Sequence, residues 1–306
     1  MQAQLGPMHS YAGHTGPVLA INFHPRIERF ASCGADSSVR LWIPGYNQPS
    51  LTLTQHNQTS WLFALGFHPK IELLAGASAT GQVWLWDTGP GHSAGIWGGH
   101  DAEALALAFS SDGSQLATGS ADGTVLIRDS LKGSRLGRLL HPDTVCSLTW
   151  SPDDQYLLTG SEDGQTRVWD AASEQMLAVL YQSNGWVNSV AWSPSGHLIA
   201  CGLETGEAIV LEASTGQPQH ILEGHTASVL SVAFSADSQT LATGSADGTA
   251  RLWEVATGHL MAVAGNHRQA VTAVAFSPQI KERDTFWLAT ASRDSLVRLW
   301  SLAISP

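Results

Sequence analysis

Residues 241–249 read "LATGSADGT", and the same nine residues stand at 116–124. Related runs occur near residues 30, 157, 198 and 288, so the run is a piece of a longer unit that returns along the chain. Six residues after the Asp position a Trp follows in five copies: Trp42, Trp86, Trp169, Trp253 and Trp300. Thr80 holds the Asp position ahead of Trp86, and Arg128 and Leu211 replace the Trp in the other two copies. The chain therefore contains seven copies of one unit.

Spacing between further markers supports this count. An aromatic residue ends an apolar stretch thirteen residues before the Asp position in six copies, and Phe276 stands eighteen residues before Asp294 in the seventh. A His lies nine residues before the aromatic residue in five copies: His14, His100, His141, His225 and His267. His56 lies eleven residues before Phe67, and Ser183 replaces the His in copy five. Only two of these spacings differ between copies, so the copies are expected to share one local structure.

The local pattern within a copy is that of β-strands. "VLSVAFS", "QTLATGS", "TARLWEV" and "GHLMAVAG" are short runs rich in apolar, β-branched and aromatic residues, separated by turn signals. The Asp-Gly pairs favour tight hairpins with both turn residues at positive φ. Four strands in each of seven copies predict an all-β fold, a seven-bladed β-propeller of four-stranded antiparallel blades.

The sequence resembles the WD-repeat (WD-40) propeller family over nearly the whole chain. Three kinds of motif carry the resemblance. The Gly-His pairs are Gly13-His14, Gly99-His100 and Gly224-His225, and the Trp-Asp pairs are Trp86-Asp87 and Trp169-Asp170. The turns "GSADGT" and "GSEDGQ" are the third kind. One domain over residues 1–306 is expected, with blades at 14–55, 56–99, 100–140, 141–182, 183–224, 225–266, and 267–306 together with 1–13. Residues 5–11 are expected to supply the outermost strand of the last blade and to close the ring. The charged insertion at 279–286 is expected to be a solvated loop, with a second contact as the alternative.

A His before the first strand and an Asp between the second and third strands fall at the same end of an up-and-down sheet. The resemblance implies that they join a structural tetrad in which Trp donates to Ser, Ser to His, and His to Asp. The expected tetrads are His141, Ser161, Asp163, Trp169; His225, Ser245, Asp247, Trp253; and His267, Ser292, Asp294, Trp300. A hydrolytic Ser-His-Asp triad is the alternative, but an enzyme needs one such site and this chain repeats it around the ring.

If the repeated residues are scaffold, function belongs to exposed positions that differ between copies. The WD-repeat resemblance places the usual contact surface around the channel at the end that bears the His and Asp loops. The predicted partner-binding residues on this rim are Trp61, Phe63, Trp186, Leu19, Leu105, Leu230, Glu103, Glu162, Glu204 and Arg293. The alternative is that the aromatic rings fold back onto neighbouring Gly and Ala residues.

Composition limits the classes of function. With 15 Lys and Arg against 26 Asp and Glu, the net charge of −11 disfavours nucleic acid and anionic membranes as partners. Three widely spaced cysteines suggest neither disulfides nor a zinc site, and the absence of a leader or an apolar span predicts a cytoplasmic protein. The expected function is a non-catalytic, monomeric scaffold without metal or cofactor that binds protein or peptide segments with apolar and basic residues. A small-ligand or peptide sensor and an enzyme that uses the central channel are the alternatives.

Overall fold

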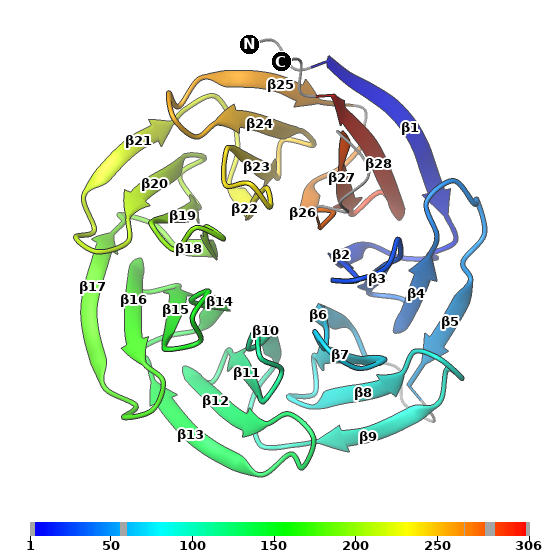
Figure 1. Cartoon of the computed structure of the whole chain (residues 1–306), viewed down its shortest axis with the longest axis horizontal. Helices are drawn as coiled ribbons and strands as arrows, with labels where there is room; N and C mark the ends of the chain where they lie inside the picture. The colour runs from blue at the N-terminus through cyan, green and yellow to red at the C-terminus, as the bar shows by residue number, and fades with distance from the viewer. Residues whose placement is uncertain (1–3, 56–59, 266, 279–284, 304–306) are drawn as a thin grey trace.

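Seven four-stranded antiparallel sheets stand around a central channel in the computed structural model (Figure 1). The structure describes residues 4–55, 60–265, 267–278 and 285–303, so His56 and most of the 279–286 insertion lie outside the described residues. Each sheet is one blade, and its strands follow one another from the channel to the circumference. The predicted seven-bladed β-propeller is therefore confirmed.

The innermost strand of each blade lines the channel. These strands are β2 (Val18–Phe23), β6 (Leu62–Phe67), β10 (Ala104–Phe109), β14 (Val145–Trp150), β18 (Val187–Trp192), β22 (Val229–Phe234) and β26 (Val271–Phe276). Each ladder to the second strand skips one residue directly after the first pair, for example between Val18 and Ala20. Such a bulge leaves its residue out of the ladder and changes the direction of its side chain. The seven bulge residues are Leu19, Phe63, Leu105, Cys146, Asn188, Leu230 and Thr272.

The second and third strands form the middle of each blade, where nearly every residue is buried. The second strands are β3 (Phe30–Gly34), β7 (Leu73–Ser78), β11 (Gln115–Ser120), β15 (Tyr156–Ser161), β19 (Leu198–Leu203), β23 (Thr240–Ser245) and β27 (Thr285–Ser292). The third strands are β4 (Ser38–Trp42), β8 (Val83–Asp87), β12 (Thr124–Asp129), β16 (Gln165–Asp170), β20 (Ala208–Glu212), β24 (Ala250–Glu254) and β28 (Leu296–Ala303). Because alternate side chains of a strand face opposite sides, each middle strand packs against both neighbouring blades.

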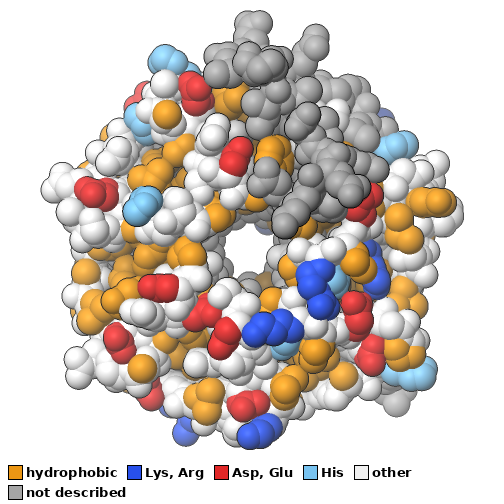
Figure 2. All heavy atoms as spheres, in the orientation of Figure 1, with side chains coloured by type: hydrophobic (Ala, Val, Ile, Leu, Met, Phe, Trp, Pro, Cys, Tyr) orange, Lys and Arg blue, Asp and Glu red, His pale blue; other side chains and the backbone are white. Residues whose placement is uncertain are grey.

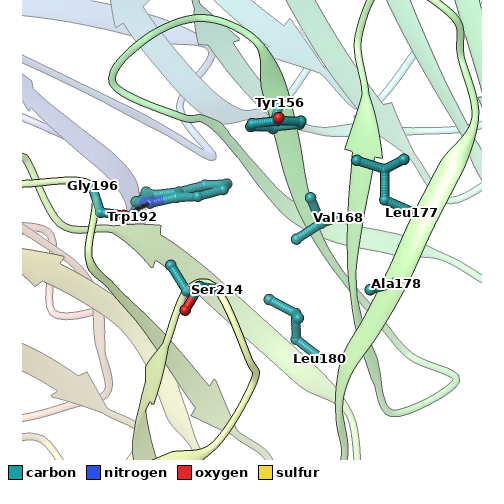
Figure 3. Close-up of a pocket in the computed structure, with 9 residues that line it drawn as sticks. Tyr156, Val168, Leu177, Ala178, Leu180, Trp192, Gly196 and Ser214 are labelled. Atoms are coloured by element: carbon teal, nitrogen blue, oxygen red, sulfur yellow. Dashed lines mark hydrogen bonds between the residues drawn. The ribbon is translucent and has the colours of Figure 1, made fainter.

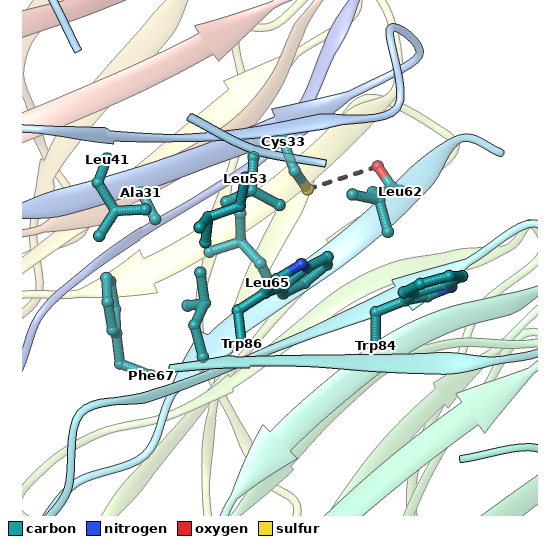
Figure 4. Packing of buried hydrophobic residues seen from close by; sticks show 11 residues of the cluster. Ala31, Cys33, Leu41, Leu53, Leu62, Leu65, Phe67, Trp84 and Trp86 are labelled. Carbon is teal, nitrogen blue, oxygen red and sulfur yellow. Dashed lines mark hydrogen bonds between the residues drawn. The ribbon is translucent and has the colours of Figure 1, made fainter. Parts of the chain in front are cut away.

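Apolar layers between adjacent blades form the core. Figure 4 shows the layer between blades 1 and 2, where Leu41 and Leu53 of blade 1 face Phe67 and Trp86 of blade 2. The thiol of Cys33 donates to the carbonyl oxygen of Leu62 across this layer, at 3.5 Å. Each blade is thus held by packing on both sides, which suits a ring without free sheet faces.

The outer strands complete the blades, and the N-terminal strand closes the ring. The outer strands are β5 (Leu51–Thr54), β9 (Ser93–Trp97), β13 (Arg135–Leu140), β17 (Met176–Gln182), β21 (Pro218–Leu222), β25 (Leu260–Ala264) and β1 (Gln4–Ala12). β1 pairs with β28, in the order β1-β28-β27-β26. Tyr11 of β1 is 1% exposed, and its hydroxyl accepts a hydrogen bond from the Gly45 backbone N–H of blade 1. The predicted closure is confirmed.

The hairpin between the second and third strands differs in detail from the expectation. In the turn after β11, Gly123 has a φ of 76°, and its N–H donates to the Ser120 carbonyl oxygen. Asp122 is not among the described residues with positive φ, so the expectation that both turn residues have positive φ is wrong. The Asp122 carboxylate accepts from the Thr124 backbone N–H at 2.8 Å instead. The Asp therefore stabilises the turn through its side chain.

Candidate interaction face and the relays beneath it

One end of the ring, here called the His/Asp face, carries the loops before the inner strands and the turns between the second and third strands. Blade 6 shows the local arrangement. The indole N–H of Trp253 donates to Thr243 Oγ1 at 2.9 Å, and the Thr243 hydroxyl lies 2.8 Å from His225 Nε2. His225 Nδ1 lies 2.9 Å from Asp247 Oδ2. With Nδ1–H donating to the carboxylate, Nε2 accepts from the threonine, so one chain of hydrogen bonds crosses the blade.

The hydroxyl in these relays is not the predicted serine. Thr159, Thr243 and Thr290 bridge Trp and His in blades 4, 6 and 7, so the assignment of Ser161, Ser245 and Ser292 to the tetrads is wrong. Each serine lies two residues nearer to the turn, beyond the reach of the Trp. Ser245, for example, donates to the Ala227 carbonyl oxygen at 2.9 Å. In the sequence, the hydroxyl of the relay is marked by the residue ten positions before the Trp position. This residue is Ser or Thr in five copies: Ser32, Thr118, Thr159, Thr243 and Thr290.

The relays differ between blades. Blade 1 has a complete relay through Ser32, which the sequence analysis missed because Gly34 stands at the expected serine position. In blade 4 the relay stops at His141, because Asp163 pairs with Arg167 and the described residues offer His141 Nδ1 no hydrogen-bond partner. Burial and the Arg167 charge lower the pKa of His141 to about 4.

Blade 3 keeps part of the relay without a Trp. His100 lies 2.8 Å from Thr118 Oγ1 and 3.3 Å from the Asp122 carboxylate. Arg128, which replaces the Trp, donates to the carbonyl oxygens of Gly98 and Gly133. The Arg128 guanidinium therefore bonds two backbone carbonyl groups, whereas the indole in blades 1, 4, 6 and 7 bonds a hydroxyl of the relay.

Blades 2 and 5 have lost the relay. Gly76 and Cys201 stand where the other blades have Ser or Thr, and Thr80 and Thr205 replace the Asp. These are the two blades in which a Trp stands in the loop before the inner strand.

The relays are structural. Thr243 and Ser245 are both fully buried, as are the corresponding Thr159 and Ser161. A hydrolytic nucleophile has to reach a bound substrate, and these hydroxyls are already bonded on both sides. Burial raises the pKa of Asp247, but hydrogen bonds from Thr249 and His225 outweigh it and lower the pKa to about 2. The carboxylates thus stay charged as acceptors within the fold.

Backbone hydrogen bonds bring the predicted rim residues together. In each blade the N–H of the residue before the Asp position donates to the carbonyl oxygen of the residue two before the bulge. Ala79 bonds Trp61 at 2.9 Å, and Glu204 bonds Trp186 at 3.0 Å. Glu162 bonds Thr144 in the same way, and Arg293 bonds Ala270. The loops that vary between copies therefore meet at one edge.

Two large aromatic side chains are exposed on this edge. Trp61 is 53% exposed and Trp186 is 45% exposed. Phe63 is partly buried and lies edge-on to Trp61, with ring centroids 6.2 Å apart. About half of each Trp side chain is therefore exposed and half is buried.

The remaining predicted rim residues surround them. Glu103, Glu204 and Arg293 are exposed, and Glu162 is partly buried. Glu204 also accepts the Trp186 backbone N–H at 3.1 Å, so this carboxylate positions the Trp loop. The bulge residues on the rim with apolar side chains are partly buried: Leu19, Leu105 and Leu230. A partner-binding role for these residues stays a prediction.

A groove of about 340 Å³ lies elsewhere, between blades 4 and 5 (Figure 3). Its walls are Leu177 and Leu180 of β17, and Tyr156 and Trp192 line it as stacked rings. The Trp192 indole N–H is already bonded to the Gly196 carbonyl oxygen. The lining of this groove is mainly apolar.

The comparisons with known proteins agree with this repeat. The profile of "WD domain, G-beta repeat" matches residues 5–42, 91–129, 133–170, 174–207, 216–254 and 258–301. The chain belongs to the WD40 repeat family. WD40 propellers generally mediate protein–protein interactions. The stretch 43–90 between the first two matches contains β6, β7 and β8 of blade 2, in which Gly76 and Thr80 stand at the hydroxyl and Asp positions of the relay.

A segment of 31 residues is 58% identical to the "Polycomb group protein FIE2" of Zea mays. The match covers 10% of this chain and 8% of that protein. It spans less than one blade, so it supports the WD40 repeat and assigns no role. Among the described residues, no helix is long and apolar enough to cross a membrane, and no three His, Cys, Asp or Glu side chains are grouped as metal ligands would be.

Proposed function

We propose that this WD40 propeller is a non-catalytic scaffold that binds protein or peptide segments across its His/Asp face. The observation that carries the proposal is the exposure of Trp61 and Trp186 on that face. Exposed indoles are costly in water, and Trp is enriched at the centres of protein interfaces. A partner that covers both rings removes their apolar surface from water, and this favours binding.

The two tryptophans belong to blades on opposite sides of the channel. Their inner strands, β6 and β18, face each other across the opening in Figure 1. A segment that contacts both therefore crosses the channel mouth. Glu103, Glu162 and Glu204 belong to blades 3 to 5 and favour a segment with Lys or Arg beside its apolar residues.

Blades 2 and 5 are also the blades without a relay. Blades 2 and 5 have replaced the hydroxyl and the Asp of the relay, and they carry Trp61 and Trp186 in the adjoining loops. We interpret this as local specialisation for contact.

Affinity capture from cells tests the proposal. Trp61→Ala with Trp186→Ala is expected to weaken capture of specific partners by at least about tenfold, because interface Trp residues carry much of the binding energy. The matched control is Ile96→Ala with Leu136→Ala, which removes two side chains that are 46% and 53% exposed on the outer strands. Both variants should keep the wild-type melting temperature. Full retention of every partner by the Trp variant contradicts the proposal.

A further inference from the structure

The face opposite to the His/Asp face carries the loops between the first and second strands. In blades 1 and 2 these loops read "FHPRIE" at 23–28 and "FHPKIE" at 67–72. The corresponding loops of the other blades begin with Ser, as in "FSSDGS" at 109–114 and "WSPDDQ" at 150–155. Two adjacent blades thus share a motif that the rest of the ring lacks.

The shared motif gives the two loops the same backbone geometry. His24 Nδ1 accepts from the N–H groups of Arg26 and Ile27 at 3.1 and 3.2 Å. His68 Nδ1 accepts from Lys70 and Ile71 at 3.1 and 3.3 Å. An imidazole nitrogen that accepts two donors carries no proton, and burial lowers the pKa of both histidines. The neutral rings therefore hold each loop in one conformation.

Both loops are packed against the next blade. The ring of His24 lies 4.9 Å from that of Phe67, and the ring of His68 lies 5.2 Å from that of Phe109. His68 Nε2 donates to the Gly113 carbonyl oxygen at 2.9 Å. The two tips are rigid parts of the ring rather than loose loops.

The tips present cations beside exposed isoleucines. Ile27 is 40% exposed and Ile71 is 43% exposed. Arg26 and Lys70 stand directly before them, and both are exposed. Figure 2 shows Lys and Arg side chains gathered beside the channel mouth over this sector, with Asp and Glu side chains next to them and over the other sectors of the same face. Glu28 and Glu72 of these two loops are exposed as well.

One carboxylate links the two loops. Glu72 lies 3.9 Å from Arg26 and 3.7 Å from Arg29, and it accepts from the Thr88 hydroxyl at 2.8 Å. Glu72 therefore fixes the arginines of blade 1 against blade 2. The side chain of Arg26 remains 49% exposed.

We propose that the loops at 24–29 and 68–72 form a second docking surface, which binds an acidic segment of another protein that carries apolar side chains. The paired Arg-Ile and Lys-Ile tips offer two similar subsites, each with a cation for a carboxylate and an apolar contact beside it. Arg26, Arg29 and Lys70 outnumber Glu28 and Glu72 in these two loops, so on a chain with a net charge of −11 this sector is locally basic and favours an acidic segment. The exposed isoleucines favour a peptide with apolar side chains over a nucleic acid, because isoleucine makes no favourable contact with phosphate groups.

A labelled twelve-residue peptide with alternating Glu and Leu residues is a suitable probe, with binding followed by fluorescence anisotropy. We expect saturable binding to the full chain that weakens at higher salt. Arg26→Glu with Lys70→Glu should weaken it at least about tenfold through charge repulsion. The matched control, Lys132→Glu with Arg135→Glu, changes the charge equally at exposed sites of blade 3 and should change the affinity less than about twofold.

Ile27→Ser with Ile71→Ser separates this proposal from simple charge attraction. It should weaken binding of the Glu-Leu peptide and leave binding of a polyglutamate peptide unchanged. Equal binding of polyglutamate or of a single-stranded oligonucleotide overturns the proposal in favour of a general anion surface. No binding of the Glu-Leu peptide at millimolar protein, or equal loss in the blade 3 control, overturns it as well.

Discussion

At the residue scale, Thr243 connects three parts of blade 6. Its hydroxyl accepts from Trp253 on β24 and bonds His225 in the loop before β22. It is fully buried, so no water replaces these bonds when the hydroxyl is lost. The Thr in each relay is thus a cross-link between the loop and the middle of the blade.

Thr243→Val should therefore destabilise the protein. The substitution keeps the shape of the side chain and leaves the indole N–H and the imidazole nitrogen without partners, at a cost of about 2 kcal/mol. Ser245→Ala should cost less, about 1 kcal/mol, because the relay remains complete. Urea unfolding of both variants measures the difference, and an equal or larger cost for Ser245→Ala contradicts the assignment.

The buried histidine of blade 4 predicts a pH dependence. The pKa of His141 is lowered to about 4, below its ordinary value of 6.5. Between these values the unfolded chain binds a proton that the folded protein does not, so stability falls as the pH falls from about 6.5 to 4. His141→Asn should reduce this slope in urea unfolding measured at several pH values, and an unchanged slope contradicts the prediction.

The relays show what sequence reasoning reaches at this scale. The positions of His, Asp and Trp in blades 6 and 7 followed from the spacing of the repeat, and the WD-repeat resemblance implied that they join one tetrad. The wrong hydroxyl was chosen because Ser and Thr both recur, and spacing does not show which of them lies beside the Trp. Asp163 was expected to bond His141, but the neighbouring Arg167 provides a closer charge.

At the element scale, β1 joins the two ends of the chain. It forms the outer strand beside β28, and Tyr11 packs on Phe30 and Trp42 of blade 1 with ring centroids 5.1 and 5.3 Å apart. This one strand thus ties the last blade to the first.

Tyr11→Ala should destabilise the ring by about 3 kcal/mol or more, because it leaves a cavity between two blades and unpairs the Gly45 N–H. Ser10→Ala changes an exposed residue of the same strand and serves as the control, with an expected change below about 1 kcal/mol. Thermal unfolding of the two variants tests this. A small effect of Tyr11→Ala contradicts the role of β1 in closure.

Strand order and ring closure followed from the repeat, whereas two local features did not. The bulge at the second residue of every inner strand has no turn residue or Gly to mark it, as Leu19 and Asn188 show. The loops at 24–29 and 68–72 were passed over because they fall between the repeat markers. Their His-Pro motifs were visible in the sequence, but their cations are brought together only by the packing of blade 1 on blade 2.

At the scale of the whole molecule, the ring presents two faces of different chemistry. The His/Asp face offers exposed Trp61 and Trp186 with nearby glutamates, and the opposite face offers basic tips with isoleucines. If both proposals hold, such a scaffold binds two partners of opposite charge at once. Which proteins these are does not follow from the repeat, because partner contacts lie at the positions that vary between copies.

Site-specific photo-crosslinking tests the central claim, partner binding at the aromatic rim, most directly. A photoreactive phenylalanine analogue is placed at Trp61, at Trp186, and at Leu136 on the outer strand β13 as a control that is 53% exposed. Irradiation in cells should give partner adducts from positions 61 and 186 and none from position 136. Adducts from position 136 alone, or none from the two rim positions, would contradict the account.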